Sequence, residues 1–164
     1  SKIEIIDLGC GDGTLTAEMA KFANHVTGVD INPNILAMAQ QRIDRLRLHN
    51  VSFLVEDVSN LSLSSESLDI VFFSQSLHHL ENPKKGLHEA ARILRPGGKV
   101  MIMELGSHEE DWVLEKLGHK WLGFEEEYLI ECMLNAGLKN LYSEVLPYRR
   151  EELFQIILTA GGKF

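Results

Sequence analysis

The chain has few cysteines and no long apolar run. Two of its 164 residues are cysteine, Cys10 and Cys132, and their spacing matches neither a disulfide framework nor a zinc site. No apolar stretch approaches the ~18 residues that a membrane-spanning helix needs. We therefore expect reduced thiols, no membrane partner and a cytoplasmic protein.

Basic residues are also scarce relative to acidic ones. Sixteen Lys and Arg stand against 24 Asp and Glu, which gives a formal net charge of −8. This sign repels phosphate groups, so nucleic acid is a poor candidate partner. The length fits one domain over residues 1–164. Because the chain opens almost directly on an apolar strand pattern, we expect it to lack N-terminal sequence, which leaves open a fused or associated N-terminal domain.

Two familiar metal and phosphate motifs are absent. A zinc-protease helix, H-E-x-x-H, would need a second histidine at Arg92 after His88 and Glu89. A phosphate loop, G-x-x-x-x-G-K, would need glycine at Ile93 ahead of Lys99. We therefore expect no bound metal and no phosphate loop.

What the sequence does contain is a glycine-rich turn near its start. An apolar run of strand length ends in Gly9, Gly11 and Gly13, and a helical pattern follows. Glycine tolerates positive φ and lets a ligand approach the backbone. The spacing differs from the dinucleotide fingerprint G-x-G-x-x-G, and Asp7 stands two residues ahead of it. The turn by itself is also compatible with an ordinary α/β sheet without a ligand.

The rest of the chain alternates strand and helix patterns, which predicts an α/β doubly wound sheet. Asn-Pro pairs at residues 32–33 and 82–83 predict helix starts, with asparagine as cap and proline at the first helical position. The last two strand patterns, residues 138–145 and 153–159, are joined by residues 147–150, a link too short for a crossover helix. These two strands should therefore be antiparallel. The other expected strands cover residues 26–29, 51–55, 68–73 and 100–105, and helix patterns cover residues 15–22, 36–46, 87–94 and 129–136.

Polar side chains follow the carboxyl ends of several predicted strands, where open α/β sheets bind ligands. Asp30 lies about twenty residues after the glycine loop, a position that suits hydrogen bonding to ribose hydroxyls. The alternative interpretation is a solvated loop carboxylate. His78 and His79 follow the strand at residues 68–73 and could act as acid–base groups, or one could bond a neighbouring carbonyl.

The D-x-G-x-G-x-G pattern from Asp7 resembles the first motif of class I S-adenosylmethionine-dependent methyltransferases. The L-R-P-G-G-K run at residues 94–99 is similar to methyltransferases of the ubiquinone and menaquinone type. The resemblance implies a Rossmann-like sheet of order 3-2-1-4-5-7-6 with the last strand antiparallel, S-adenosylmethionine as cofactor and a small-molecule acceptor. It also implies cofactor contacts from glycine-loop residues, strand-end residues and one serine near the sulfur, namely Asp7, Gly9, Cys10, Gly11, Gly13, Asp30, Ile31, Asp57, Val58 and Ser74.

Residues 106–124 form the least regular stretch. They hold aromatic and titratable groups, among them His108, Trp112, His119 and Trp121. The amino-acid sequence of this stretch resembles that of methyltransferase domains that are joined to arsenic-repressor-type winged-helix domains. The stretch could wall an acceptor site, or its tryptophans could pack on the core. Four histidines are catalytic candidates, with none assigned: His78, His79, His108 and His119.

Two other functions stay open at this stage. A non-catalytic domain could bind cofactor or effector and regulate a partner domain. A nicotinamide-dependent oxidoreductase is disfavoured by the glycine spacing and by the two strand-end acids, Asp30 and Asp57.

Overall fold

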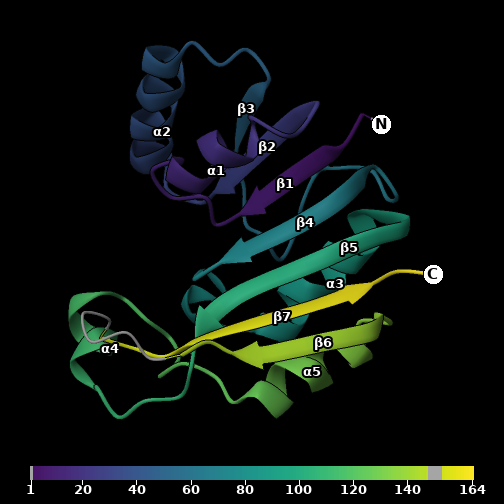
Figure 1. Cartoon of the computed structure of the whole chain (residues 1–164). Coiled ribbons are helices and arrows are strands. Elements are labelled where there is room, and N and C mark those ends of the chain that lie inside the picture. Colours follow the sequence, from purple (N-terminus) through teal and green to yellow (C-terminus); the bar gives the residue numbers. More distant parts are fainter. Residues whose placement is uncertain (1, 148–152) are drawn as a thin grey trace.

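A computed structural model describes residues 2–147 and 153–164 as one seven-stranded sheet of order β3-β2-β1-β4-β5-β7-β6 (Figure 1). β7 runs antiparallel to both β5 and β6, and the other neighbouring strands are parallel. The strand order, the reversed last strand and the Rossmann-like class are confirmed. Within the described residues, no helix has the length and apolar character needed to cross a membrane.

The elements follow one another with short links. The strands are β1 Glu4–Leu8, β2 His25–Asp30, β3 Val51–Val55, β4 Leu68–Ser74, β5 Leu94–Leu105, β6 Lys139–Val145 and β7 Ile156–Gly162. The helices are α1 Thr14–Met19, α2 Pro33–Leu46, the 3-10 turn η1 Leu77–His79, α3 Pro83–Ile93, α4 Trp112–Lys116 and α5 Glu126–Asn135.

Both Asn-Pro pairs start helices as predicted. The side chain of Asn32 accepts a hydrogen bond from the Asn34 amide at 3.0 Å, and that of Asn82 accepts one from the Lys85 amide at 3.3 Å. Each cap satisfies a helix amide that would otherwise lack a partner. Two loops that leave the carboxyl edge of the sheet, after β2 and after η1, are thereby fixed at their far ends.

The sheet carries apolar clusters on both faces. Ile6 and Leu8 belong to a large cluster that includes residues of α3 and α5, which lie together behind the sheet in Figure 1. Ile5 belongs to a smaller cluster with Ala20 and Val26. Neighbouring strand residues point to opposite faces, so β1 contributes to both clusters. This two-sided burial holds the strand that leads into the glycine loop.

Three expectations about element boundaries were wrong. α1 ends at Met19, and Phe22, expected on its inner face, is 82% exposed. β5 starts at Leu94 instead of residue 100, because Leu94 already pairs with Leu68 before a register shift. β7 starts at Ile156 instead of residue 153. Of the predicted link, residues 148–150 lie outside the described residues, while the antiparallel pairing of β6 with β7 is confirmed.

Candidate functional site

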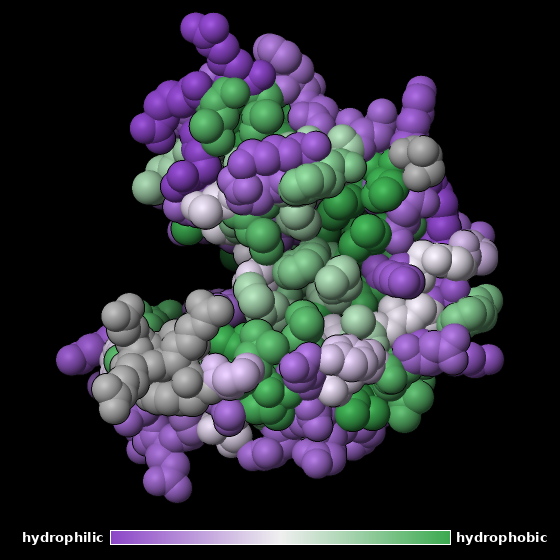
Figure 2. All heavy atoms as spheres, in the orientation of Figure 1, coloured by the Kyte–Doolittle hydropathy of each residue, from purple (hydrophilic) through white to green (hydrophobic). Residues whose placement is uncertain are grey.

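A cavity of about 1100 Å³ opens at the carboxyl ends of β1, β2, β3 and β4. Figure 2 shows the molecule hollowed on this side. The volume lies just above the ~300–1,000 Å³ that is typical of small-molecule sites. Residues after each of these strands line it, together with Leu117 and Lys120 from the connection between β5 and α5.

Eight of the ten predicted cofactor residues line this cavity: Gly9, Cys10, Gly11, Asp30, Ile31, Asp57, Val58 and Ser74. They come from four separate strand ends. The other two, Asp7 and Gly13, do not line the cavity, and Asp7 is 1% exposed. Their contacts are with the protein: Asp7 Oδ2 accepts a hydrogen bond from Thr16 Oγ1 at 2.6 Å, and a Cβ on Gly13 would lie 2.9 Å from Cβ of Ala39.

The amides of the glycine loop are already engaged inside the protein. The amides of Gly9 and Cys10 donate to the carbonyl of Val29 at 2.8 and 2.9 Å. The Gly11 amide donates to Asp30 Oδ2 at 3.1 Å. A phosphate-binding loop needs such amides free. This loop is therefore built to place backbone beside a ligand and not to hold a phosphate.

The three loop glycines have different reasons to be glycine. All three have positive φ, between 54° and 77°. A Cβ at Gly9 would lie 2.4 Å from Cβ of Ser76, so Gly9 lets the ends of β1 and β4 approach closely. A Cβ at Gly11 would meet only Cδ1 of Ile35, at 3.9 Å. Gly11 therefore borders open space, and that space belongs to the cavity.

Burial perturbs the ionisation of two loop residues. Desolvation raises the pKa of Asp7 to about 6, against a lowering by the Thr16 hydrogen bond. The second carboxyl oxygen of Asp7, Oδ1, is buried without a hydrogen-bond partner. Burial, with the nearby Asp7 and Asp30 carboxylates, also raises the pKa of the Cys10 thiol, which is therefore protonated and unreactive.

The cavity is rich in acids. Five carboxyl side chains line it, against two lysines, Lys85 and Lys120; the acids are Asp12, Asp30, Glu56, Asp57 and Glu81. The negative charge of this cavity wall favours a cationic ligand and disfavours a pyrophosphate.

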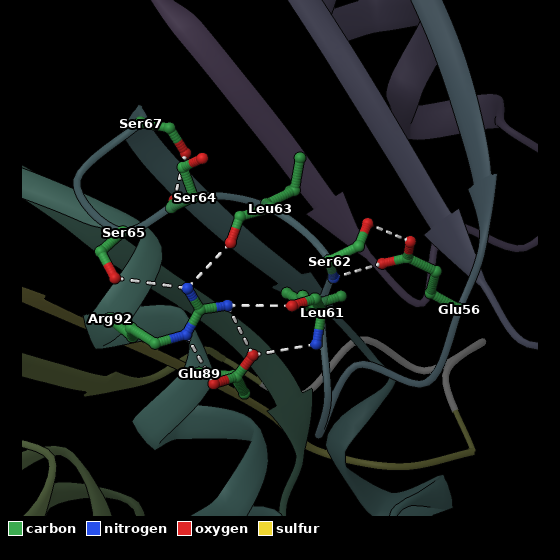
Figure 3. A network of polar contacts seen from close by, with 9 residues as sticks. All are labelled: Glu56, Leu61, Ser62, Leu63, Ser64, Ser65, Ser67, Glu89 and Arg92. Atoms are coloured by element: carbon green, nitrogen blue, oxygen red, sulfur yellow. Dashed lines mark hydrogen bonds and ion pairs between the residues drawn. The ribbon is translucent and has the colours of Figure 1, made fainter.

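The loop between β3 and β4 is braced from below by α3 (Figure 3). The Arg92 guanidinium donates to the carbonyls of Leu61 and Leu63 at 3.1 and 2.8 Å. Glu89 pairs with Arg92 and accepts from the Leu61 amide at 2.9 Å, and this pairing lowers the pKa of Glu89. At the β3 end of the loop, the Glu56 carboxylate accepts hydrogen bonds from the amide and the hydroxyl group of Ser62. The network holds Asp57 and Val58 at the cavity rim.

Three of the four candidate histidines lie together. The ring centroids of His78 and His79 are 4.3 Å apart, and that of His119 lies 4.1 Å from His78 and 4.9 Å from His79. His79 lines the cavity. Burial is the main cause that lowers the pKa of His119 to about 4, and the charges of the neighbouring histidines lower it further. Burial also lowers the pKa of His79.

His108 lies apart from the cavity lining. Its Nδ1 accepts a hydrogen bond from the Glu110 amide at 3.1 Å, and its ring lies 4.3 Å from that of Phe154. Its Nε2 is buried without a partner, and burial lowers its pKa. The two tryptophans of this stretch are not among the cavity-lining residues either. Trp121 packs on the large apolar cluster and donates to the Leu80 carbonyl at 2.9 Å, while Trp112 is 38% exposed.

Glu104 and Gln75 are among the residues in or beside the site that the sequence did not single out. Glu104 of β5 is fully buried, and its carboxylate accepts from the amides of Leu77 and Leu105, both at 2.9 Å, and contacts Nδ1 of His78 at 2.5 Å. The sequence signal for Glu104 was a single charged residue inside an otherwise apolar strand pattern. Gln75 lines the cavity with a left-handed φ of 50°, a strained conformation often found at functional sites, and no sequence signal marked it.

The sheet order and the strand-end cavity define a doubly wound α/β protein with a ligand site at the carboxyl edge of its sheet. Comparison with known families makes this specific. The family described as "Methyltransferase domain" matches residues 6–102, more than half of the chain. The chain belongs to that family, which confirms the resemblance to class I S-adenosylmethionine-dependent methyltransferases.

Individual relatives extend the comparison. The chain is 25% identical over 118 residues to the ubiquinone biosynthesis O-methyltransferase of Coxiella burnetii, covering 72% of this chain and 50% of that one. It is 28% identical over 172 residues to the demethylmenaquinone methyltransferase of Leptospira interrogans, covering 98% and 67%. The chain thus spans between half and two thirds of these two relatives' length.

A solved structure matches the whole fold. Phosphoethanolamine N-methyltransferase 2 of Haemonchus contortus, in complex with S-adenosyl-L-methionine, superposes with a TM-score of 0.83 at 18% identity. The match covers 99% of this chain and 49% of the other. At this identity the likeness concerns the fold.

Proposed function

We propose that this chain binds S-adenosylmethionine and catalyses methyl transfer to a small-molecule acceptor. The observation that carries the proposal is the pairing of an acid-rich cavity with a glycine loop in which the amides of Gly9, Cys10 and Gly11 are engaged internally. S-adenosylmethionine is a cationic sulfonium without phosphate, and when bound it supplies an electrophilic methyl group. Family membership and the ligand of the Haemonchus structure support the same cofactor.

The cofactor end of the cavity fits this ligand residue by residue. Gly11 leaves room for it beside the loop. The Asp30 carboxylate accepts hydrogen bonds from the amides of Gly11 and Asn32, which orders the loop. Its position at the cavity rim suits hydrogen bonding to ribose hydroxyls. Asp57 and Val58, at the end of the neighbouring strand, offer a polar and an apolar contact for an adenine ring.

The acceptor end lies between η1 and residues 117–120. Leu80 and Leu117 supply apolar surface there, and His79 and Lys120 supply polar groups. These walls suit a small molecule with an apolar body and one nucleophilic atom. The names of the two curated relatives, both methyltransferases of quinone-type compounds, point the same way.

Methyl transfer needs chiefly a near-attack alignment of acceptor and methyl group. A general base is needed only when the acceptor carries a proton that must leave. His79 is the candidate histidine that lines the cavity, and its lowered pKa leaves it neutral near pH 7 and able to accept a proton.

Calorimetry tests the cofactor. The protein should bind S-adenosylhomocysteine and S-adenosylmethionine, and it should not bind NADH. Preferential binding of NADH would overturn the proposal in favour of an oxidoreductase. Turnover is then tested with methyl-labelled cofactor and a pool of small-molecule extracts, and cofactor binding without label transfer to any fraction would favour the non-catalytic regulatory domain.

A further inference from the structure

The cluster of His78, His79 and His119 brings together side chains from two distant segments. His78 and His79 belong to η1, directly after β4, while His119 follows α4. Each ring offers one nitrogen, and these nitrogens lie within 4.8 Å of one another. Three imidazoles at this spacing are a recognised ligand set for a divalent transition metal.

Hydrogen bonds leave one nitrogen free on two of the rings. Nδ1 of His78 faces the Glu104 carboxylate at 2.5 Å, and Nδ1 of His79 lies 3.4 Å from the Gly118 carbonyl. Both partners accept hydrogen bonds, so each Nδ1 carries the proton and each Nε2 keeps its lone pair. A carboxylate behind a histidine is the usual support of a metal-binding imidazole, because it fixes the tautomer and the ring orientation.

The third ring shows an unsatisfied polar atom. His119 is 8% exposed, and its Nδ1 is buried without a hydrogen-bond partner. A buried unpaired nitrogen costs free energy unless something binds it.

The segment that carries His119 is held in place against η1. The amides of Lys120 and Trp121 donate to the His78 carbonyl at 2.7 and 3.3 Å. The cluster therefore rests on backbone hydrogen bonds and does not depend on a chance approach of side chains.

We propose that His78, His79 and His119 bind a Zn²⁺-class divalent metal ion, with Glu104 as the positioning residue behind His78. In a tetrahedral site with metal–nitrogen bonds of ~2.1 Å, ligand nitrogens lie ~3.4 Å apart. The rings must therefore close by about 1.4 Å at most from their 4.8 Å limit. Three histidines leave a fourth coordination position open, and of the three histidines His79 is the one that lines the cavity. Binding of an acceptor oxygen there rests on the proposed function and leaves no general-base role for His79, whose Nε2 would then be a metal ligand. The metal site itself does not rest on the proposed function.

The test measures metal binding directly on the untagged full chain after removal of metals with a chelator. Zn²⁺ is titrated in competition with a chromophoric chelator, and Co²⁺ serves as a probe whose visible absorption reports tetrahedral coordination. We expect one ion per chain. His119→Ala should weaken Zn²⁺ binding at least about 100-fold, and Glu104→Gln about 10- to 100-fold. His88→Ala, an exposed histidine of α3, is the matched control and should bind Zn²⁺ like the parent.

S-adenosylhomocysteine binding and circular dichroism check the fold of each variant. If His119→Ala fails to fold, His79→Ala, whose side chain is exposed, replaces it. A parent protein that binds Zn²⁺ no more tightly than these variants would overturn the metal site and leave the cofactor proposal standing. Loss of cofactor binding in the parent would count against the proposed function alone.

Discussion

The two parts of the cavity wall are built differently. Its proposed cofactor end comes from the connections after β1 and β2 and from the loop between β3 and β4, all within residues 6–102, the part that matches the methyltransferase family. Its acceptor end takes Leu117 and Lys120 from one long connection beyond that part. In the connection after β1, hydrogen bonds such as that from Gly11 to Asp30 tie the loop to the neighbouring strand end.

The long connection is tied to the sheet and to η1 by backbone hydrogen bonds. A parallel bridge joins Gly106 to Phe124 at its base, and the His78 carbonyl holds residues 120 and 121. Loops of this kind accept sequence change while a rigid scaffold positions them. Because the two walls come from separate segments, substitutions can perturb them independently, and the following variants test this.

The largest effect is expected at Gly11. Gly11→Val should weaken S-adenosylhomocysteine binding at least about 100-fold, because its side chain would enter cavity space. Gly137→Val is the matched control: it has positive φ and no atom within 4 Å of a new Cβ, but it follows α5. Both variants should share a small loss of thermal stability from backbone strain. Equal cofactor affinity in the two variants would show that the loop is only a turn.

The next effect separates packing from acceptor binding in the long connection. Trp121→Ala should lower the free energy of unfolding by about 3 kcal/mol, since the ring packs on the large apolar cluster. Trp112→Ala should change it by no more than about 0.5 kcal/mol, because Trp112 is a surface residue. Urea unfolding measures both. A stable Trp121→Ala protein with impaired turnover would instead make this tryptophan part of the acceptor wall.

The buried acid behind the glycine loop should give a pH signature. The unfolded Asp7 carboxyl releases its proton near pH 4, whereas the folded one releases it near pH 6. The folded state therefore holds the extra proton between these values, and the contribution of Asp7 to stability falls as pH rises from about 4 to about 6. The total fall is about 3 kcal/mol, at ~1.4 kcal/mol per pKa unit.

Asp7→Asn removes this titration and keeps an oxygen for Thr16. Its free energy of unfolding relative to the parent should therefore rise by about 3 kcal/mol between pH 4 and pH 7. Urea titrations at one-unit steps measure the difference, with the exposed Asp44→Asn as control. A difference that does not change with pH would mean that Asp7 titrates like an exposed acid.

The smallest effect concerns the strand-end acid. Asp30→Ala should weaken S-adenosylhomocysteine binding by about 2 kcal/mol, through loss of a charge-assisted hydrogen bond. Asp44→Ala, an exposed acid of α2, should leave the affinity unchanged. Calorimetry of correctly folded proteins gives both values. Unchanged affinity in Asp30→Ala would remove this residue from the cofactor site.

Local signals were enough to predict much of the fold. Asparagine caps followed by proline fixed two helix starts, and alternating strand and helix patterns led to the confirmed sheet order once the family resemblance was added. These features follow from neighbouring residues, because caps, turns and strand periodicity act over a few positions. The same reasoning failed at boundaries such as Leu94, where pairing with a strand distant in sequence decided the start of β5.

The sequence by itself determined the glycine loop, the strand-end acids and the edge of the sheet where ligands bind. Only the tertiary structure decided which histidines meet and that Trp121 packs on the core. Sequence motifs could not show that these histidines meet, because motifs describe residue spacing along one segment. His78 and His119 come from segments 41 residues apart in the chain, with Glu104 behind them on a third. Contacts of this range are set by sheet order and by a loop folding back on η1, and no local pattern encodes them.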